Sequence, residues 1–264
     1  MKSIVFRGNQ VFYKSDGNGP AVVLLHGFGE DSIVWDSTIE FCKKDFRLIV
    51  PDLPGSGQSP VCAEGSSMEI MAEMVAELIN AESIPDISLI GHSMGGYISL
   101  AFAEKYPEKL RSLGLFHSTA YPDNEEKKEA RRKSIAFIRQ HGAAKFIRQS
   151  TPNLFSESFR EKFPSIVSEF TERNTNFSPE ALVSYYEAMI ARPDRSDLLK
   201  TIAKPVMFIM GRFDNAIPLE SNLSQSHLPS VAHLKILENS GHMGMIEETG
   251  QSLSFLLKFL KETL

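Results

Sequence analysis

The sequence contains little cysteine and tryptophan, with two of the first and one of the second in 264 residues. Cys42 and Cys62 are too few for a disulfide scaffold, and neither has a His or Cys at metal-ligand spacing. We therefore expect two free thiols and no metal site. Glycine-rich nucleotide motifs are missing too, because Gly55-Ser56-Gly57 has neither the lysine of a P-loop nor Gly-x-Gly-x-x-Gly spacing. That segment indicates a plain turn, and no cofactor is expected.

Long apolar runs are also missing. The apolar run 21–25 has the length of a buried strand and falls far below the roughly 20 residues of a membrane span. The run that ends at Phe6 is too short for the core of a secretory signal. We expect a cytoplasmic protein with no membrane partner.

An excess of positive charge is absent. The formal net charge is −5, from 28 Lys and Arg against 33 Asp and Glu, and the basic residues form no stripe along the sequence. Binding to nucleic acid depends on clustered Lys and Arg on one face. The expected partner is therefore a small molecule rather than nucleic acid, bound by a monomer or a homodimer.

What the sequence does contain is an alternation of strand and helix patterns. Residues 3–15 alternate apolar and polar around Gly8-Asn9, which predicts a hairpin. Helical patterns separate several short apolar runs that predict buried strands, at 21–25, 46–50, 87–90, 113–116, 206–210 and 233–237. This rhythm implies parallel strands joined by right-handed crossovers. The predicted fold class is α/β, with a mostly parallel twisted sheet flanked by helices.

The rhythm is interrupted in the middle of the chain. Residues 1–117 and 194–264 are predicted to form the core, and 118–193 a helical lid inserted in it. The lid contains Tyr185, Tyr186, Met189 and seven of the 18 phenylalanines. We expect some of this surface to line a pocket and most of it to pack the lid on the core. The phenylalanines are Phe137, Phe146, Phe155, Phe159, Phe163, Phe170 and Phe177. Residues 117–195 hold 13 Lys and Arg against 11 Asp and Glu, a balance of +2, which would tolerate an anionic substrate.

Ser93 is the candidate nucleophile. It lies in Gly91-His92-Ser93-Met94-Gly95, between the apolar run 87–90 and a helical pattern that begins at Tyr97. Gly-x-Ser-x-Gly alone is a weak signal, but between a strand and a helix the two glycines relieve the collisions of a sharp turn that exposes the hydroxyl.

A serine hydroxyl needs a base, and the base needs a carboxylate to fix its tautomer. His242 and Asp214 follow predicted strands, and loops at the carboxyl ends of parallel strands lie at the same edge of the sheet. Asp123 is the rival acid. His26 and His92 lie near turns and are expected to be structural. The other four histidines are expected to be surface or packing residues: His117, His141, His227 and His233.

Taken together, the order Ser93, Asp214, His242 and the strand end Leu24-Leu25-His26-Gly27 resemble the α/β-hydrolase fold, specifically its serine hydrolases with a helical lid. The resemblance implies an oxyanion hole made by the backbone N–H groups of Phe28 and Met94. Substrate contacts are expected from Phe28, Met94 and Met243. Dehalogenase and epoxide-hydrolase relatives have Asp at the nucleophile position, so those reactions are disfavoured.

The leading prediction is hydrolysis of a carboxylic ester or related acyl bond of a small to medium, largely apolar substrate. Ser93 would attack the carbonyl carbon, and water would release the acid from the acyl-enzyme. Two alternatives stay open. One is carbon–carbon bond hydrolysis or elimination on a metabolic intermediate, with cofactor-free perhydrolysis as a variant. The other is a non-catalytic ligand receptor that retains the triad.

Overall fold

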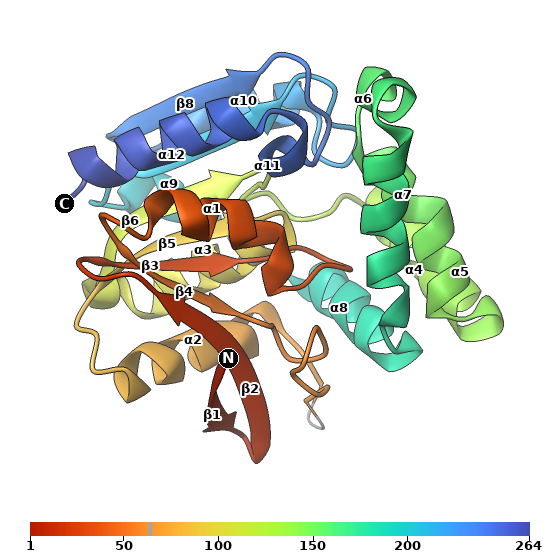
Figure 1. Ribbon diagram of the computed structural model, residues 1–264, viewed down its shortest axis with the longest axis horizontal. Helices are drawn as coiled ribbons and strands as arrows, with labels where there is room; N and C mark the ends of the chain where they lie inside the picture. The colour runs from red at the N-terminus through yellow and green to blue at the C-terminus, as the bar shows by residue number, and fades with distance from the viewer. Residues whose placement is uncertain (63–64) are drawn as a thin grey trace.

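The computed structural model describes residues 1–62 and 65–264, and its central feature is one eight-stranded sheet (Figure 1). The strands are β1 (Lys2–Phe6), β2 (Asn9–Asp16), β3 (Ala21–Leu25), β4 (Arg47–Pro51), β5 (Ile87–His92), β6 (Leu110–Phe116), β7 (Val206–Gly211) and β8 (Ala232–Leu237). Their spatial order is β1-β2-β4-β3-β5-β6-β7-β8. The predicted N-terminal hairpin and all six predicted apolar strands are present.

The sheet is antiparallel at one edge and parallel elsewhere. β2 pairs antiparallel with β1 and β4, and each pairing from β4 through β8 is parallel. Parallel pairing brings the carboxyl ends of β3, β5, β6 and β7 to the same edge of the sheet. The predicted α/β class with a mostly parallel sheet is confirmed.

Helices cover both faces of the sheet. They are α1 (Asp36–Cys42), α2 (Met68–Ala81), α3 (Met94–Lys105), α4 (Glu125–His141), α5 (Ala143–Ser150), α6 (Glu157–Lys162), α7 (Pro164–Arg173), α8 (Pro179–Ala191), α9 (Ser196–Thr201), α10 (Leu219–Ser226), α11 (Gly244–Glu247) and α12 (Thr249–Glu262). Successive residues of β3 show the division, because Val23 and Leu25 pack with α2 and α3 whereas Val22 and Leu24 pack with α1 and α12. A strand buried on both faces must be apolar throughout, as β3 is.

Residues 118–193 contain helices and turns but no strand, and we call them the helical insertion. In Figure 1 its helices α4 to α8, green to cyan, stand together at one end of the sheet, and the arrowhead of β3 points towards α8. Local signals set their ends: the Ser178 hydroxyl accepts from the Ala181 N–H to cap α8, and Gly142 at φ 85° separates α4 from α5.

Two details differ from the sequence-based expectation. Within the predicted lid, residues 156–173 show one helical pattern in the sequence. In the structure they form two helices, because Pro164 lacks an N–H and starts a new helix, α7. The short helices α9, α10 and α11 were not predicted, since one or two turns contain too few residues to show a helical period. Both cysteines are free, as expected, and both are buried. Among the described residues no helix is long and apolar enough to cross a membrane.

The close approach of α3 to the sheet depends on glycines. A Cβ on Gly91 would lie 2.2 Å from the carbonyl carbon of Gly95, and a Cβ on Gly95 would lie 2.5 Å from the carbonyl oxygen of Leu25. These neighbours are backbone atoms, so no side chain can rotate away to make room. The turn between β5 and α3 therefore requires glycine at both positions.

Gly91→Ala should lower the free energy of unfolding by about 2 kcal/mol or more, because the added methyl group overpacks a rigid junction. Gly250→Ala is the matched control. Position 250 is in the first turn of α12 with nothing within 4 Å of an added Cβ, and alanine there should be neutral or stabilise by up to about 1 kcal/mol. Chemical denaturation of both variants provides the comparison. Equal stability of the two variants would contradict this account of the junction.

Candidate active site

Ser93 lies at the turn between β5 and α3 in a strained conformation. Its φ is 51° and its ψ is −115°, which is uncommon for a residue with a side chain. The Ser93 N–H donates to the Phe116 carbonyl at 2.9 Å, which ties the turn to the neighbouring strand β6. The Ser118 hydroxyl donates to the Ser93 carbonyl at 2.7 Å. The backbone is thus held so that the serine side chain is half-buried at the strand end, as a nucleophile elbow requires.

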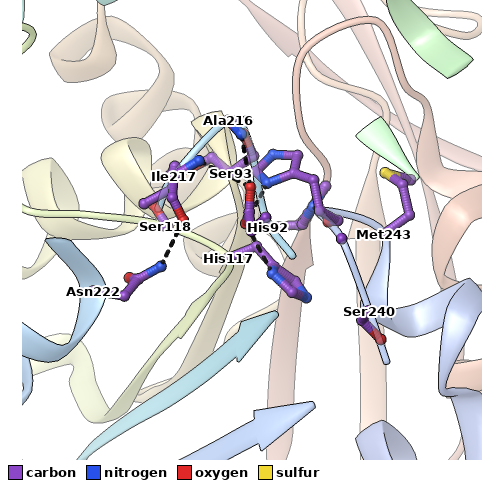
Figure 2. Close-up of polar contacts among 12 residues, drawn as sticks. His92, Ser93, His117, Ser118, Ala216, Ile217, Asn222, Ser240 and Met243 are labelled. Carbon is purple, nitrogen blue, oxygen red and sulfur yellow. Dashed lines mark hydrogen bonds and ion pairs between the residues drawn. The ribbon is translucent and has the colours of Figure 1, made fainter. Parts of the chain in front are cut away.

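Asp214 and His242 meet at the same edge of the sheet. The Nδ1 of His242 donates to Asp214 Oδ2 at 2.8 Å, and Asp214 Oδ1 accepts from the N–H groups of Ala216 and Ile217 at 2.9 Å each. Figure 2 shows Ser93, Ala216 and Ile217 in one small region of this edge. Burial acts to raise the pKa of Asp214, but the two histidines that contact it lower that pKa well below its usual value. Asp214 is therefore a buried carboxylate.

His117 is the second histidine on Asp214, and this corrects the expectation that it is a surface or packing residue without a partner. Its Nδ1 donates to Asp214 Oδ2 at 3.1 Å (Figure 2). Burial lowers the pKa of His117 to about 4, so the ring is neutral at pH 7. Its Nε2 is buried with no hydrogen-bond partner among the described residues. No pattern in the sequence indicates this contact, because His117 only follows the last residue of a strand, β6.

Asp123, the rival acid, belongs to a different cluster. It accepts from Arg131 Nε at 2.6 Å and from Arg192 Nη2 at 2.9 Å. These arginines lower the pKa of Asp123, although burial opposes them. The structure places Asp214, and not Asp123, against His242.

A buried ion pair connects three loops of the site. His92 Nδ1 faces Glu30 Oε2 at 3.0 Å, and His92 Nε2 faces the backbone carbonyl of His242 at 3.0 Å. Both partners accept hydrogen bonds, so both ring nitrogens of His92 donate and the ring is an imidazolium. Burial opposes this charge, but Glu30 raises the pKa of His92, and His92 in turn lowers that of Glu30. Glu30 also accepts the Gly27 N–H at 2.8 Å.

His26 and His92 connect loops, in keeping with the expectation that both are structural. His26 Nδ1 donates to the Gly27 carbonyl at 2.8 Å, and its Nε2 accepts from the Leu53 N–H at 3.0 Å. The Ser56 hydroxyl reaches the same Nε2 at 2.8 Å. The loop after β3 is thereby fixed to the loop after β4.

A cavity of about 220 Å³ lies beside these groups, and both Ser93 and His242 line it. Of the three expected substrate contacts, Phe28 lines the cavity, whereas Met94 and Met243 are fully buried outside its lining. The backbone N–H groups of Phe28 and Met94 donate to none of the other described residues. Both amides are thus available as the two donors of an oxyanion hole.

The helical insertion supplies part of the cavity wall. Tyr186 lines it and stacks on Phe28, with ring centroids 4.3 Å apart. Met189, which was expected to belong to a pocket-lining surface together with Tyr186, also lines the cavity, whereas Tyr185 and the seven insertion phenylalanines do not. Two basic side chains of α4, Lys127 and Arg131, do line the cavity, and sequence patterns did not single them out.

Among the described residues, one group of side chains could hold a metal ion: His117, Asp214 and His242. Their potential ligand atoms lie within 4.8 Å of one another. In this structure those atoms already pair as two donors and one acceptor. Asp214 Oδ2 therefore already accepts a hydrogen bond from each of the two histidines.

The model of the alpha/beta hydrolase fold family matches residues 20–249. A pimeloyl-[acyl-carrier protein] methyl ester esterase from Nitrosomonas europaea is 27% identical over 92% of this chain and 97% of its own. A thermophilic esterase from Thermogutta terrifontis, solved with malate bound, is 29% identical, with a TM-score of 0.94 over 100% of this chain and 99% of its own. An enol-lactonase from Burkholderia xenovorans LB400 shares the fold at 22% identity, with a TM-score of 0.91 over 98% and 100%.

The family match covers most of the chain and includes the strand end after β3, the Ser93 turn and the loops that contain Asp214 and His242. The resemblance recognised in the sequence is therefore confirmed. The chain belongs to the alpha/beta hydrolase fold family and is a hydrolase enzyme of that family.

Proposed function

We propose that the protein hydrolyses a carboxylic ester of a small, largely apolar acyl group through an acyl-enzyme on Ser93. The observation that carries the proposal is the shared cavity of Ser93 and His242, combined with the hydrogen bond from His242 Nδ1 to Asp214. A proton on Nδ1 leaves Nε2 free to accept the serine proton. The relatives named as esterases support the choice of bond.

In this mechanism the neutral ring of His242 removes the proton from Ser93 as the serine oxygen attacks the ester carbonyl. The developing oxyanion is held by the N–H groups of Phe28 and Met94, which are fixed in place and lose no hydrogen bond of their own. His242 then gives the proton to the leaving alcohol. In the second half, His242 activates a water molecule that releases the acid and restores Ser93.

The size and lining of the cavity support a small acyl group. About 220 Å³ is below the roughly 300–1,000 Å³ that is usual for pockets of drug-sized ligands. Seven of the 13 lining residues are aromatic or aliphatic: Phe28, Tyr97, Leu154, Tyr186, Met189, Ala216 and Ile217. An apolar wall favours apolar acyl chains until the available volume is filled.

Ser93→Ala should lower kcat for short p-nitrophenyl esters by about four to six orders of magnitude, since members of a triad act as a unit. The variant should unfold at the temperature of the wild type, and a fluorophosphonate probe should no longer label it. Turnover of a vinylogous diketone without turnover of any ester would favour carbon–carbon hydrolysis instead. Absence of both activities, with Ser93 unlabelled in the wild type, would favour a receptor.

Asp214→Asn should lower kcat by about 10⁴-fold, because the amide can donate to His242 Nδ1 and stabilise the wrong tautomer. Asp123→Asn is the matched control. It removes the same charge from the other buried carboxylate, which contacts arginines rather than His242, and it should retain kcat within about tenfold. The acid would be misassigned if the control proved to be the crippled variant. Steady-state kinetics on one ester, with melting temperatures for both proteins, decides between the two.

The burial of His117 makes stability depend on pH, because burial lowers the pKa of this histidine although its contact with Asp214 opposes the shift. The pKa of His117 is about 4 in the folded chain, against roughly 6.5 for an unperturbed histidine. Between these values the unfolded chain binds a proton that the folded chain does not, so the free energy of unfolding falls as the pH falls. Folding raises the pKa of His92, so the contribution of His92 to the free energy of unfolding is constant below about pH 6.5. Folding lowers the pKa of Glu30, so the contribution of Glu30 is constant above about pH 4.5.

From pH 6.5 to 4.5, the His117 contribution should lower the free energy of unfolding of the wild type by about 2 to 3 kcal/mol. His117→Asn should show a flatter dependence in this range, because asparagine does not titrate and tolerates the φ of 48° at this position. Urea unfolding at stepped pH measures the two slopes. Parallel slopes would show that His117 is not the titrating group.

A further inference from the structure

The cavity wall contributed by the helical insertion is positively charged. Lys127 and Arg131 are four residues apart on α4, so they project from the same face of the helix, and both line the cavity that contains Ser93. The acidic lining residue is Glu30, whose charge is balanced by the imidazolium of His92. Positive charge on this wall therefore lacks a counter-charge within the cavity.

The ion pairs of Arg131 leave an excess of positive charge beside the cavity. Arg131 and Arg192 share the single carboxylate of Asp123, which leaves one positive charge in the group of three. Arg192 is the inner member, with a side chain 3% exposed. It stacks on Tyr97, with 3.9 Å from its guanidinium carbon to the ring centre. Arg131 is thus the member of the pair that reaches the cavity.

Lys127 adds a second positive charge. Its Nζ donates to the backbone carbonyl of Ala216 at 2.8 Å, and a carbonyl is a neutral partner. Ala216 belongs to the turn that Asp214 fixes. The ammonium group is therefore held beside the loop of the catalytic acid, and a cation in a partly enclosed wall gains most from an anion that it can contact.

We propose that the cavity selects esters whose acyl group ends in a carboxylate, that is, monoesters of short dicarboxylic acids. Arg131 and Lys127 bind the free carboxylate while the ester carbonyl lies at Ser93. This inference rests on the proposed ester hydrolysis and adds the charge of the substrate to it. The aromatic and aliphatic side chains between the two ends contact the methylene groups of the acyl chain.

A matched pair of substrates tests the charge alone. Monomethyl glutarate and methyl 5-methylhexanoate have the same ester and the same three methylene groups, and they end in a carboxylate and in an isopropyl group of similar shape. Wild-type kcat/KM should be at least about tenfold higher for the anionic ester, because charge-assisted hydrogen bonds form only with it. Equal values, or a preference for the neutral ester, would overturn the inference.

Variants assign the preference to the named side chains. Arg131→Met should lower kcat/KM for monomethyl glutarate by about 10- to 100-fold, and the ratio of the two esters should fall towards one. Asp123 remains paired with Arg192 in this variant. Arg131→Lys should recover part of the ratio, and Lys127→Met should lower it less. Arg132→Met, which removes a charge from the exposed side of α4, should leave the ratio unchanged.

A binding measurement separates this inference from the proposed function. Glutarate should slow fluorophosphonate labelling of Ser93 in the wild type and not in Arg131→Met. Labelling and ester turnover without any effect of charge would overturn the carboxylate site and leave ester hydrolysis standing. Failure of labelling and of all ester turnover would instead contradict the proposed function. A loss of both esters in equal proportion in Arg131→Met would show that this arginine only supports the fold.

Discussion

The arrangement of the site depends on one buried carboxylate at the end of β7. Asp214 accepts four hydrogen bonds, from His242, from His117 and from the amides of Ala216 and Ile217. Four donors stabilise an ionised carboxylate inside the protein, where an unpaired charge would be costly. They also fix its orientation, so that the same group sets the tautomer of one histidine and the path of the following turn.

The ion pair of His92 and Glu30 fixes the positions of the other loops of the site. His92 is the last residue of β5, Glu30 belongs to the loop after β3, and the carbonyl that His92 contacts belongs to His242 in the loop after β8. Through the Gly27 N–H, Glu30 also fixes the backbone next to the proposed oxyanion donor of Phe28. A buried ion pair contributes little net stability by itself, but it specifies one geometry because each partner is costly to leave alone.

The strands, the insertion and the residues of the proposed triad could be predicted, because each leaves a local pattern of apolar runs, glycines and strand ends. The partners that order the triad could not. His117 and Glu30 look like ordinary loop residues until the sheet brings strand ends together. Lys127 and Arg131 lie in a highly charged helix, where one face cannot be distinguished from another without knowing what it covers. The break at Pro164 was not predicted either, although a proline inside a helical pattern is a local signal that could have indicated it.

The reacting groups and the positively charged wall of the cavity belong to different parts of the fold. The proposed nucleophile, acid and base follow strands of the sheet, whereas Lys127 and Arg131 belong to a helix of the insertion. Replacing residues on α4 leaves all four hydrogen bonds that Asp214 accepts in place. Selection or engineering could therefore exchange one acyl group for another by rewriting a single helix, while the bond-breaking apparatus is inherited unaltered.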